Sequence, residues 1–487
     1  MLRARAAAAA ALAAAAAAPA RHRSPLARPL STSLRVRDPA QAQPRPAPHP
    51  PAHHADQPLQ TQAQVNDQIA RDADVLLQLY ARPNIVFSHG SGAVLFDTQG
   101  RRYLDFTAGI AVNALGHADP GVAAVVADQA SKLVHLSNLY HHEHAGPLAR
   151  MIVDGVRAAE SACVERGAAE RLGAAKVFFC NSGTEANEAA IKFARKFAQY
   201  TSGGASKFNI LSFENAFHGR TMGALSATPT RKYQEPFVPL LPGFAKARLN
   251  DISSLDTLIT EDTCAVIVEP LQGEGGIHEA KPEFLAAVRA RCDAVGALLI
   301  FDEIQCGVGR TGTMFAFEHA GVVPDVVSLA KPLASGLPIG AVIVSERVAA
   351  CIKPGDHGTT FGGSPFATRV GAHTWRTISS PEFLAAVQRA GVHLRARMLE
   401  LKDASPLIVD VRGRGLIQGI AFRENVDPQM FVRLARERGV LLVSAGCNTI
   451  RLIPPLIVSL EQIDRAAEVF EEVLGIMEGV IGSGKDL

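Results

Sequence analysis

The chain has 487 residues, of which 47% are hydrophobic and 20% are charged, and its formal net charge is +2. This length allows two domains with a large core, and the near-neutral charge argues against nucleic acid as the main partner. Seven cysteines without CxxC spacing indicate reduced thiols rather than a disulfide framework or a zinc site.

Residues 1–61 differ in composition from the rest of the chain. A poly-alanine run is followed by proline-rich sequence, with many arginines and no acid before Asp38. This pattern is typical of a transit peptide, with a plain disordered tail as the alternative. The basic, helix-forming start favours the mitochondrial matrix over the chloroplast stroma. No apolar stretch of transmembrane length follows, so we expect a soluble protein without a membrane partner.

The globular part is predicted to start with residues 62–116, an N-terminal segment of a smaller domain. The sequence VNDQIARDADVLLQLYA predicts a helix over Val65–Ala81, and GAVLFDTQGRRYLDF predicts two strands joined by a turn. Leu104–His117 is then expected to lead into the first long helix.

Residues 117–370 are predicted to form a large domain. Six apolar runs alternate with helical patterns, namely KVFFC, NILSFE, CAVIVEP, ALLIFDE, DVVSLA and GAVIVSE. Alternation of this kind predicts an α/β fold with a doubly wound, mostly parallel sheet. Residues 371–487 combine long helices with short strands, so we assign them to a smaller α/β domain that also includes the N-terminal segment.

Two of the apolar runs end at ionisable residues, Asp302 and Lys331. The carboxyl ends of parallel strands meet at one crevice, so both groups are expected to face the same ligand. A buried lysine becomes a nucleophilic amine, and an aspartate can keep a pyridine nitrogen protonated, which is what pyridoxal phosphate requires. By itself, Lys331 could equally reach solvent from a strand end.

Further residues predict how such a ligand is held. Ser182, Gly183 and Thr184 lie between the KVFFC strand and an amphipathic helix, which is the geometry of an anion site, although an ordinary capped helix has the same pattern. Phe217 could stack on a flat cofactor and Arg220 could bind a carboxylate. A core phenylalanine and a surface arginine are the alternatives.

Glycine-rich and histidine-rich motifs occur at several places in the chain. EPLQGEGG places Glu269 and Glu274 in a loop near the expected crevice. Such a loop can be an ordinary turn, but two acids beside the expected site of Lys331 and Asp302 favour a functional role. GVGRTG has dinucleotide spacing but lacks the following helix, and GVIGSGK has no strand before it, so neither predicts a nucleotide site. The sequence HHEH lacks a supporting ligand set, so we predict no metal site.

The ordered set NSGTEANE, FHGRT, EPLQGEGG, FDEIQCGVGRTG, LAKPLASGLPIGA and TTFGGSPFA resembles the class III, fold type I pyridoxal phosphate aminotransferases. The resemblance covers residues from about 75 to 480. It implies that Lys331 forms the Schiff base and Asp302 contacts the pyridine nitrogen, with Gln305 near the phenolic oxygen and Phe217 stacked on the ring. It further implies a homodimer with shared active sites.

The resemblance also implies roles at the two ends of the site. Phosphate would be held by Ser182, Gly183 and Thr184, and by Thr360 of the second subunit. A Glu274–Arg451 pair would be closed while an ω-amine substrate reacts and would open for glutamate. Arg220 would bind the remaining carboxylate of either substrate.

The segment LDFTAGIAVNALGHADP resembles acetylornithine aminotransferases, whereas ornithine δ-aminotransferases carry a tyrosine in place of Ile110. An apolar Ile110 suits a substrate whose α-amine is acetylated. The implied substrates are N2-acetyl-L-ornithine, 2-oxoglutarate and glutamate, in arginine biosynthesis. The alternatives are an aminotransferase for ornithine, 4-aminobutyrate or another ω-amine, and an inactive scaffold with the same fold.

Overall fold

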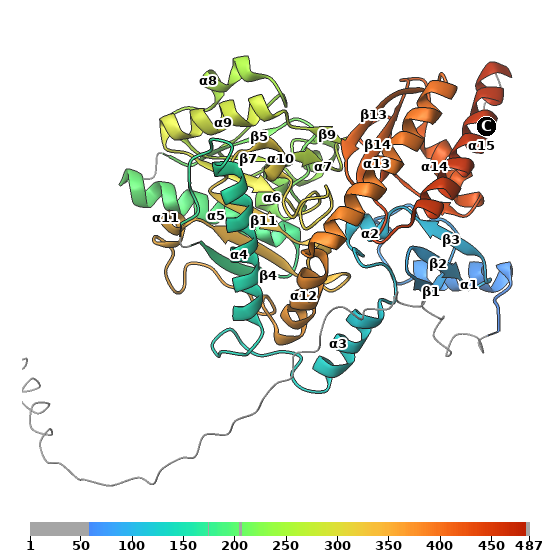
Figure 1. Cartoon of the computed structure of the whole chain (residues 1–487), viewed down its shortest axis with the longest axis horizontal. Coiled ribbons are helices and arrows are strands. Elements are labelled where there is room, and N and C mark those ends of the chain that lie inside the picture. The colour runs from blue at the N-terminus through green and yellow to red at the C-terminus, as the bar shows by residue number, and fades with distance from the viewer. Residues whose placement is uncertain (1–57, 174, 204–206, 484–487) are drawn as a thin grey trace, which may run out of the picture. The chain divides into compact units, whose positions relative to one another are not determined.

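The computed structural model describes residues 58–173, 175–203 and 207–483, and in these residues the largest sheet has seven strands in the order β4-β12-β11-β10-β7-β5-β6 (Figure 1). The strands are β4 Lys176–Cys180, β5 Asn209–Phe213, β6 Phe244–Ala247, β7 Thr263–Val268, β10 Leu298–Asp302, β11 Val326–Leu329 and β12 Gly340–Val344. All six predicted strands are present. The sequence of β6, FAKA, gave no apolar run, because two of its residues are exposed at the sheet edge.

Six of these strands run in the same direction, and β12 is antiparallel to its two neighbours, β11 and β4. A parallel pair needs a long crossover connection, usually a helix. Between β11 and β12 the chain forms only the short 3-10 turn η4 Lys331–Ala334, so the strand direction reverses there. The predicted mostly parallel α/β sheet is confirmed.

Helices cover both faces of this sheet. Alternate residues of β10 point to opposite sides: Leu298 and Ile300 lie in the core under α5 Gly183–Ser202, and Leu299 and Phe301 lie in the core on the other face. That second core includes residues of α4 Ala145–Val164, α9 Pro282–Val295 and α12 Pro365–Ile378. Burial on both faces explains the continuous apolar runs in the sequence.

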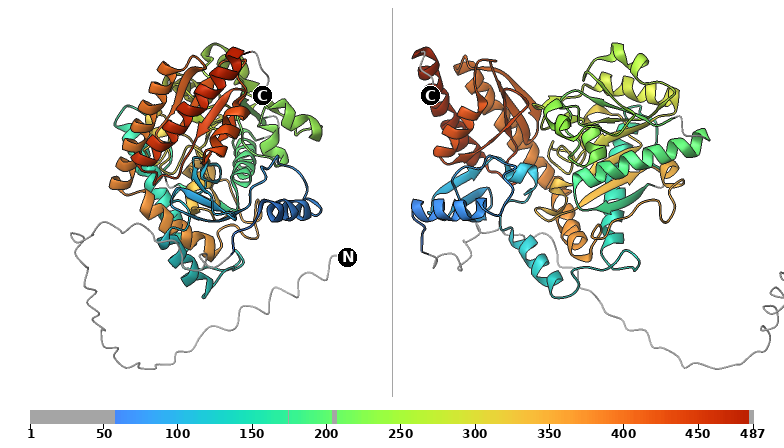
Figure 2. Two further views of the ribbon diagram at one scale, coloured as in Figure 1. Left: turned by 90° about the vertical axis from the view of Figure 1, so that its right-hand side faces the viewer. Right: turned by 180° about the vertical axis from the view of Figure 1, so that it is seen from behind.

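The N- and C-terminal parts of the described chain share a second sheet. β15 Val440–Leu441 pairs in parallel with β3 Arg102–Asp105, and Figures 1 and 2 show the blue strands beside the red helices. This sheet also contains β1 Phe87–Ser91 and β2 Val94–Asp97. A third sheet contains β13 Ile408–Arg414, β14 Ile417–Phe422, β17 Thr449–Leu452 and β16 Val443–Ala445, with α13 Pro381–Ala404, α14 Pro428–Glu437 and α15 Leu460–Ser483 nearby in sequence.

The remaining elements are short or lie between the sheets. They are α1 Gln62–Ala73, α2 Ala108–Ala111, α3 Pro120–Ala130, α6 Met222–Ser226, α7 Arg231–Gln234, α8 Leu255–Leu258, α10 Phe317–Ala320, α11 Glu346–Ala349, β8 Leu271–Gln272, β9 His278–Glu279, η2 Glu235–Phe237 and η3 Ile252–Ser254. All described residues belong to one compact unit, and the domain boundaries proposed above remain a prediction.

The predicted helix over Val65–Ala81 was wrong in its second half. Thr61 and Gln64 form a capping box at the start of α1, and the helix ends at Ala73. Apolar residues of the following segment, including Val75 and Leu77, are exposed. Apolar residues without a surface to pack against do not stabilise a helix, so the pattern here overstated its length.

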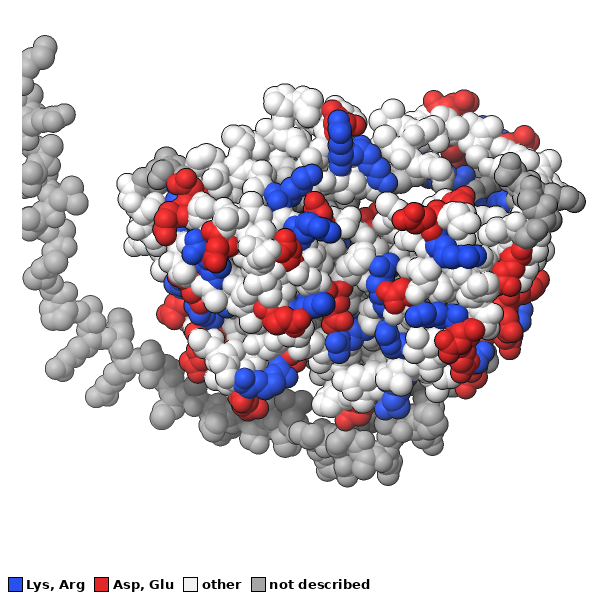
Figure 3. Space-filling view, turned by 90° about the horizontal axis from the view of Figure 1, so that it is seen from above, with Lys and Arg blue, Asp and Glu red and all other residues white. Residues whose placement is uncertain are grey.

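The sequence predictions about the leader, the membrane and metal binding concern features outside the sheets described above. The transit peptide prediction concerns residues that lie outside the described ones, apart from residues 58–61. No helix of the described part of the chain combines the length and apolar character needed to span a bilayer. Within the same residues no group of three or more His, Cys, Asp or Glu side chains is placed to hold a metal. Figure 3 shows acidic and basic side chains interspersed on one face.

Candidate active site

Lys331 follows the carboxyl end of β11 and borders a cavity of about 210 Å³. The cavity is lined by Gly183, Thr184, Phe217, His218, Gly219, Arg220, Glu269, Glu274, Asp302, Ile304, Gln305 and Lys331. The amine is accessible from this cavity, but protein surrounds it. This desolvation, with a smaller effect of the Arg451 charge, lowers the pKa of Lys331 to about 8. The side chain is therefore a nucleophile near neutral pH.

Asp302 ends β10, the neighbouring strand, and its carboxylate is held by three donors. Oδ2 accepts from Asn187 Nδ2 at 2.7 Å and lies 2.8 Å from His218 Nδ1, and Oδ1 accepts from the Ile304 N–H at 3.0 Å. Asp302 and His218 are both buried. A carboxylate fixed in this way has one orientation, as is needed to face a single ring atom.

Sequence reasoning missed Asn187 and His218. Asn187 is fully buried on α5, among buried residues that include Ala186 and Ala190, and it also donates to the His218 carbonyl at 2.7 Å. A polar residue among the buried positions of an amphipathic helix would have been the signal. His218 follows Phe217 directly, but only the fold brings it to Asp302.

Glu269 lies at the end of β7 and links two loops of the cavity. Oε1 accepts from the Phe217 N–H at 2.9 Å and Oε2 accepts from the Gly273 N–H at 3.1 Å. Burial, together with the nearby Asp302 carboxylate, raises the pKa of Glu269 to about 7. This residue therefore belongs to the cavity wall, as the sequence predicted.

The N-terminus of α5 forms one end of the cavity. Gly183 and Thr184 are in its first turn, where backbone N–H groups have no intrahelical acceptor. A Cβ atom at Gly183 would come within 2.7 Å of Ile304, and one at Gly219 within 2.2 Å of Thr184 Oγ1, so both positions need glycine for the close packing at this end. Ser182 caps the helix by accepting from the Glu185 N–H at 3.3 Å. Such a helix start binds anions.

Arg451 and Glu274 form an ion pair at the other end. Arg451 lies on β17 and is 2% exposed, and one of its terminal nitrogens is 2.8 Å from Glu274 Oε2. The other donates to Gln305 Oε1 at 3.0 Å. The Nε atom of Arg451 has no hydrogen-bond partner within the described residues. Burial lowers the pKa of this guanidinium, and Glu274 acts in the opposite direction.

Arg220 lies on the cavity wall beside aromatic rings. Its Cζ atom is 3.7 Å from the centroid of the Tyr233 ring and 5.6 Å from that of Phe217. Such stacking holds a guanidinium flat while its N–H groups stay available. Tyr233 was not among the sequence-predicted site residues.

Four predicted site residues do not line this cavity. Ser182 and Arg451 adjoin residues that do, and the other two are Ile110 and Thr360. Ile110 lies in α2, where residues 108–111 all have positive φ, and its own φ and ψ are 64° and 57°. A β-branched residue rarely adopts this left-handed conformation, which points to a functional constraint on the turn. Ile110 packs against the cluster that contains Cys306 and Ile453. Thr360 is exposed, on the loop before α12.

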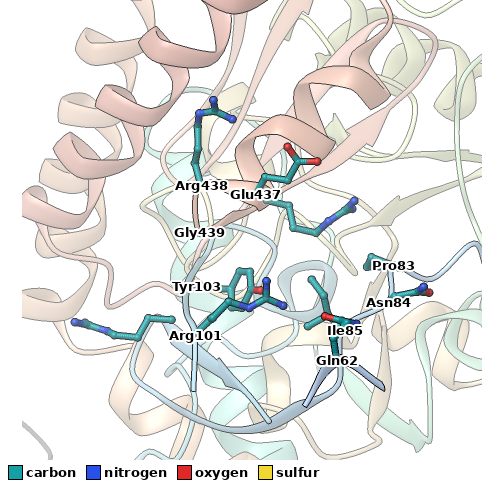
Figure 4. Close-up of a pocket in the computed structure, with 11 residues that line it drawn as sticks. Gln62, Pro83, Asn84, Ile85, Arg101, Tyr103, Glu437, Arg438 and Gly439 are labelled. Atoms are coloured by element: carbon teal, nitrogen blue, oxygen red, sulfur yellow. The ribbon is translucent and has the colours of Figure 1, made fainter. Parts of the chain in front are cut away.

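A larger cavity, of about 530 Å³, lies between α1, β3 and the end of α14 (Figure 4). It is rich in arginine, but Arg101 pairs with Asp97 and Arg438 pairs with Glu472. In Figure 4 the Arg438 side chain extends away from Tyr103. This cavity is lined by no lysine or cysteine, so the smaller cavity at Lys331 is the candidate active site.

Known proteins match most of the length of this chain. A family model described as aminotransferase class-III matches residues 79–474. A mitochondrial acetylornithine aminotransferase of Yarrowia lipolytica is 48% identical over 81% of this chain and 92% of its own length. An acetylornithine aminotransferase of Caldanaerobacter subterraneus is 43% identical over 83% of this chain and 98% of its own.

Solved structures show the same fold. The ornithine aminotransferase from Toxoplasma gondii has a TM-score of 0.79 and 31% identity, covering 86% of this chain and 96% of its own. The N-acetylornithine aminotransferase from Stenotrophomonas maltophilia has a TM-score of 0.71 and 34% identity, and the match covers 85% of this chain and 100% of that chain. The predicted fold type I architecture is therefore confirmed.

Proposed function

Because this chain belongs to the class-III aminotransferase family, we propose that it transfers the 5-amino group of N2-acetyl-L-ornithine to 2-oxoglutarate. The products are N-acetyl-L-glutamate 5-semialdehyde and L-glutamate, and the reaction is a reversible step of arginine synthesis. The observation that carries the proposal is the closed Glu274–Arg451 pair beside Lys331. Relatives named acetylornithine aminotransferase at 43–48% identity support this substrate.

The residues of the cavity fit pyridoxal phosphate, the cofactor of class-III aminotransferases. Lys331 supplies the amine for covalent attachment, and Asp302 supplies a buried carboxylate for the pyridine nitrogen. The N-terminus of α5, where Gly183 and Thr184 border the cavity, would hold the phosphate. Phe217 would pack on the ring and Gln305 would lie near the phenolic oxygen.

When bound, this cofactor supplies an aldehyde that binds amines and a ring that accepts electrons from the substrate carbon. Lys331 Nζ, once free, takes the proton from the amine-bearing carbon and returns it in the reverse direction. Asp302 holds a proton at the ring nitrogen, and Asn187 and His218 hold Asp302 in place. These residues fix the proton positions on which the chemistry depends.

The Glu274–Arg451 pair explains how one site accepts two differently charged substrates. With the pair closed, Arg451 is neutralised, and Arg220 binds the single carboxylate of acetylornithine. With the pair open, Arg451 binds the α-carboxylate of glutamate and Arg220 binds its side-chain carboxylate. The unpartnered Nε of Arg451 gives this second carboxylate a ready donor.

The nearest alternative is an aminotransferase for ornithine, 4-aminobutyrate or another ω-amine, as the ornithine aminotransferase structures illustrate. Comparing kcat/KM for acetylated and free ornithine, with 2-oxoglutarate as acceptor, tests the choice. We expect preference for the acetylated substrate because relatives at 43–48% identity are named acetylornithine aminotransferase, and preference for free ornithine would reject this choice. An inactive scaffold would give a colourless protein that does not react with borohydride.

Exposed apolar side chains support a homodimer with shared active sites. Asn138 Nδ2 donates to the Thr359 carbonyl at 3.0 Å, which brings two loops together, and Leu139, Tyr140 and Phe361 of these loops are 86%, 67% and 64% exposed. Contiguous exposed apolar groups mark protein interfaces. Thr360 lies in this patch, where it could reach the phosphate end of the second subunit's cavity.

We further propose a mitochondrial location, with the chloroplast stroma as the alternative. The arginine-rich leader and relatives named as mitochondrial support it. A fusion of residues 1–61 to a fluorescent protein, followed by imaging and an import assay, tests this location.

A further inference from the structure

Tyr233 lies between the two arginines that are proposed to bind substrate carboxylates. One face of its ring is 3.7 Å from Cζ of Arg220. Its hydroxyl is 3.4 Å from Glu274 Oε1, and the other oxygen of Glu274 is paired with Arg451. Tyr233 is thus in contact with Arg220 on one side and with the gate formed by Glu274 and Arg451 on the other.

The ring and the hydroxyl make separate contacts. The ring stacks on Arg220 and meets Phe217 edge to face, with centroids 6.1 Å apart. The hydroxyl has Glu274 as its hydrogen-bond partner. A bond to one carboxylate oxygen restricts rotation of the other, so the hydroxyl stabilises the orientation in which Glu274 neutralises Arg451.

We propose that Tyr233 is a positioning residue that couples the two arginines and sets the preference between the two amino donors. Its ring fixes Arg220 for both donors, whereas its hydroxyl favours the closed gate and therefore the donor with one carboxylate. This inference rests on the proposed function, because it assumes that acetylornithine and glutamate use the closed and open gate.

The two contacts predict different effects for two substitutions. Tyr233→Phe removes the hydroxyl and keeps the ring, so opening the gate becomes easier. A hydrogen bond of this kind contributes about threefold to tenfold in an equilibrium. We expect KM for acetylornithine to rise by about that factor, KM for glutamate to stay the same or fall, and kcat to change little because Lys331 and Asp302 are untouched.

Tyr233→Leu removes the stacking surface as well. We expect KM to rise for both donors, because Arg220 would lose its fixed orientation toward either carboxylate. Tyr103→Phe is the matched control: its hydroxyl donates to Asp97 Oδ2 at 3.1 Å in the second sheet, outside the candidate active site. The control should leave the donor ratio unchanged.

The experiment measures both half-reactions with the purified full-chain holoenzyme, following cofactor absorbance with acetylornithine or glutamate as donor. A Tyr233→Phe protein whose kcat/KM falls for acetylornithine relative to glutamate supports the coupling. Equal changes for both donors, or no change, overturn the hydroxyl's role. If Tyr233→Leu shows the same donor pattern as Tyr233→Phe, the role of the ring is overturned.

Binding of glutarate gives a second measurement that does not depend on turnover. This dicarboxylate needs both Arg220 and Arg451, so it binds only with the gate open, and the Tyr233→Phe protein should bind it about threefold to tenfold more tightly by calorimetry. Unchanged or weaker binding would contradict the proposal. A wild-type protein that binds glutarate but does not use acetylornithine would reject the proposed function alone.

Discussion

The two ends of the candidate active site differ in how firmly their charged groups are held. Asp302 is 3% exposed and receives three hydrogen bonds from Asn187, His218 and Ile304. The Glu274 side chain is 36% exposed, and its side-chain partners in the described chain are Arg451 and, at a longer distance, Tyr233. The first arrangement suits a group that stays bound, and the second suits a group that moves during each reaction cycle.

The charge balance explains why the movable end does not open at random. Arg451 is almost fully buried, and removing the partner of a buried charge is strongly unfavourable. Under the proposed function, we therefore expect Glu274 to leave only when another carboxylate, such as that of glutamate, replaces it. The fixed end has no such exchange, so substitutions there should affect every substrate alike.

The strongest test of the fixed end is the Lys331→Ala substitution. We expect the rate of transamination to fall by at least about a thousandfold with either donor, because no amine remains to attach the cofactor or move the proton. Steady-state rates measure it, with circular dichroism to confirm folding. Lys207→Met is a suitable control, since Lys207 is a buried lysine that donates to the Val295 carbonyl away from the cavity. A Lys331→Ala protein with normal turnover would refute the proposed chemistry.

The pH dependence of Lys331 tests the same end without substrate. Burial lowers its pKa to about 8, and only the neutral amine reacts, so its reactivity should fall about tenfold for each pH unit below 8. Competitive acetylation of the apoprotein by trace acetic anhydride, followed by mass spectrometry, measures this directly. Lys132, whose side chain is 58% exposed, serves as the surface reference. A Lys331 midpoint near 10 would show that the amine is not desolvated.

Thr360 tests whether the fixed end needs a second subunit. We expect Thr360→Ala to weaken cofactor retention about tenfold, as for the loss of one hydrogen bond to a charged group. Mixed dimers of Thr360→Ala and Lys331→Ala subunits should then recover one intact site, because each subunit supplies the residue that the other lacks. Differently tagged, co-expressed subunits allow purification of the mixed species. Activity no higher than the average of the two parent variants would indicate unshared sites.

The fixed end was largely predictable from the sequence, and the reason is physical. Strands buried on both faces form continuous apolar runs, so an ionisable residue at the end of a run, such as Asp302 or Lys331, stands out. The start of α5 was similarly marked by turn residues before an amphipathic pattern. Residue types and spacing were sufficient to predict these residues because each is marked by its immediate neighbours in the sequence.

The other features of the candidate site depend on contacts between segments that are distant in sequence. Tyr233 lies in the polar sequence TRKYQEP, which gives no sign of its position between Arg220 and Glu274. His218 reaches Asp302 across 84 positions of sequence. The left-handed turn around Ile110 contains one glycine among four residues with positive φ, so propensity alone predicts an ordinary helix or loop. Such features are set by packing, which a single sequence does not display.

The smallest effect is expected at the movable end, from Glu274→Gln. The neutral amide keeps the shape of the side chain but no longer neutralises Arg451, so kcat/KM for acetylornithine should fall about threefold to tenfold relative to glutamate. Both half-reactions measured on one holoenzyme preparation give this ratio. Glu279→Gln is a matched control, because the Glu279 side chain is also 36% exposed and pairs with Arg414 at 2.9 Å. The two pairs differ in the arginine, since the Arg414 side chain is 45% exposed and that of Arg451 is 2% exposed. An exposed pair contributes little, so the control should leave the ratio unchanged. Equal losses for both donors in Glu274→Gln would mean that this end is as fixed as the other, and the contrast between the two ends would not hold.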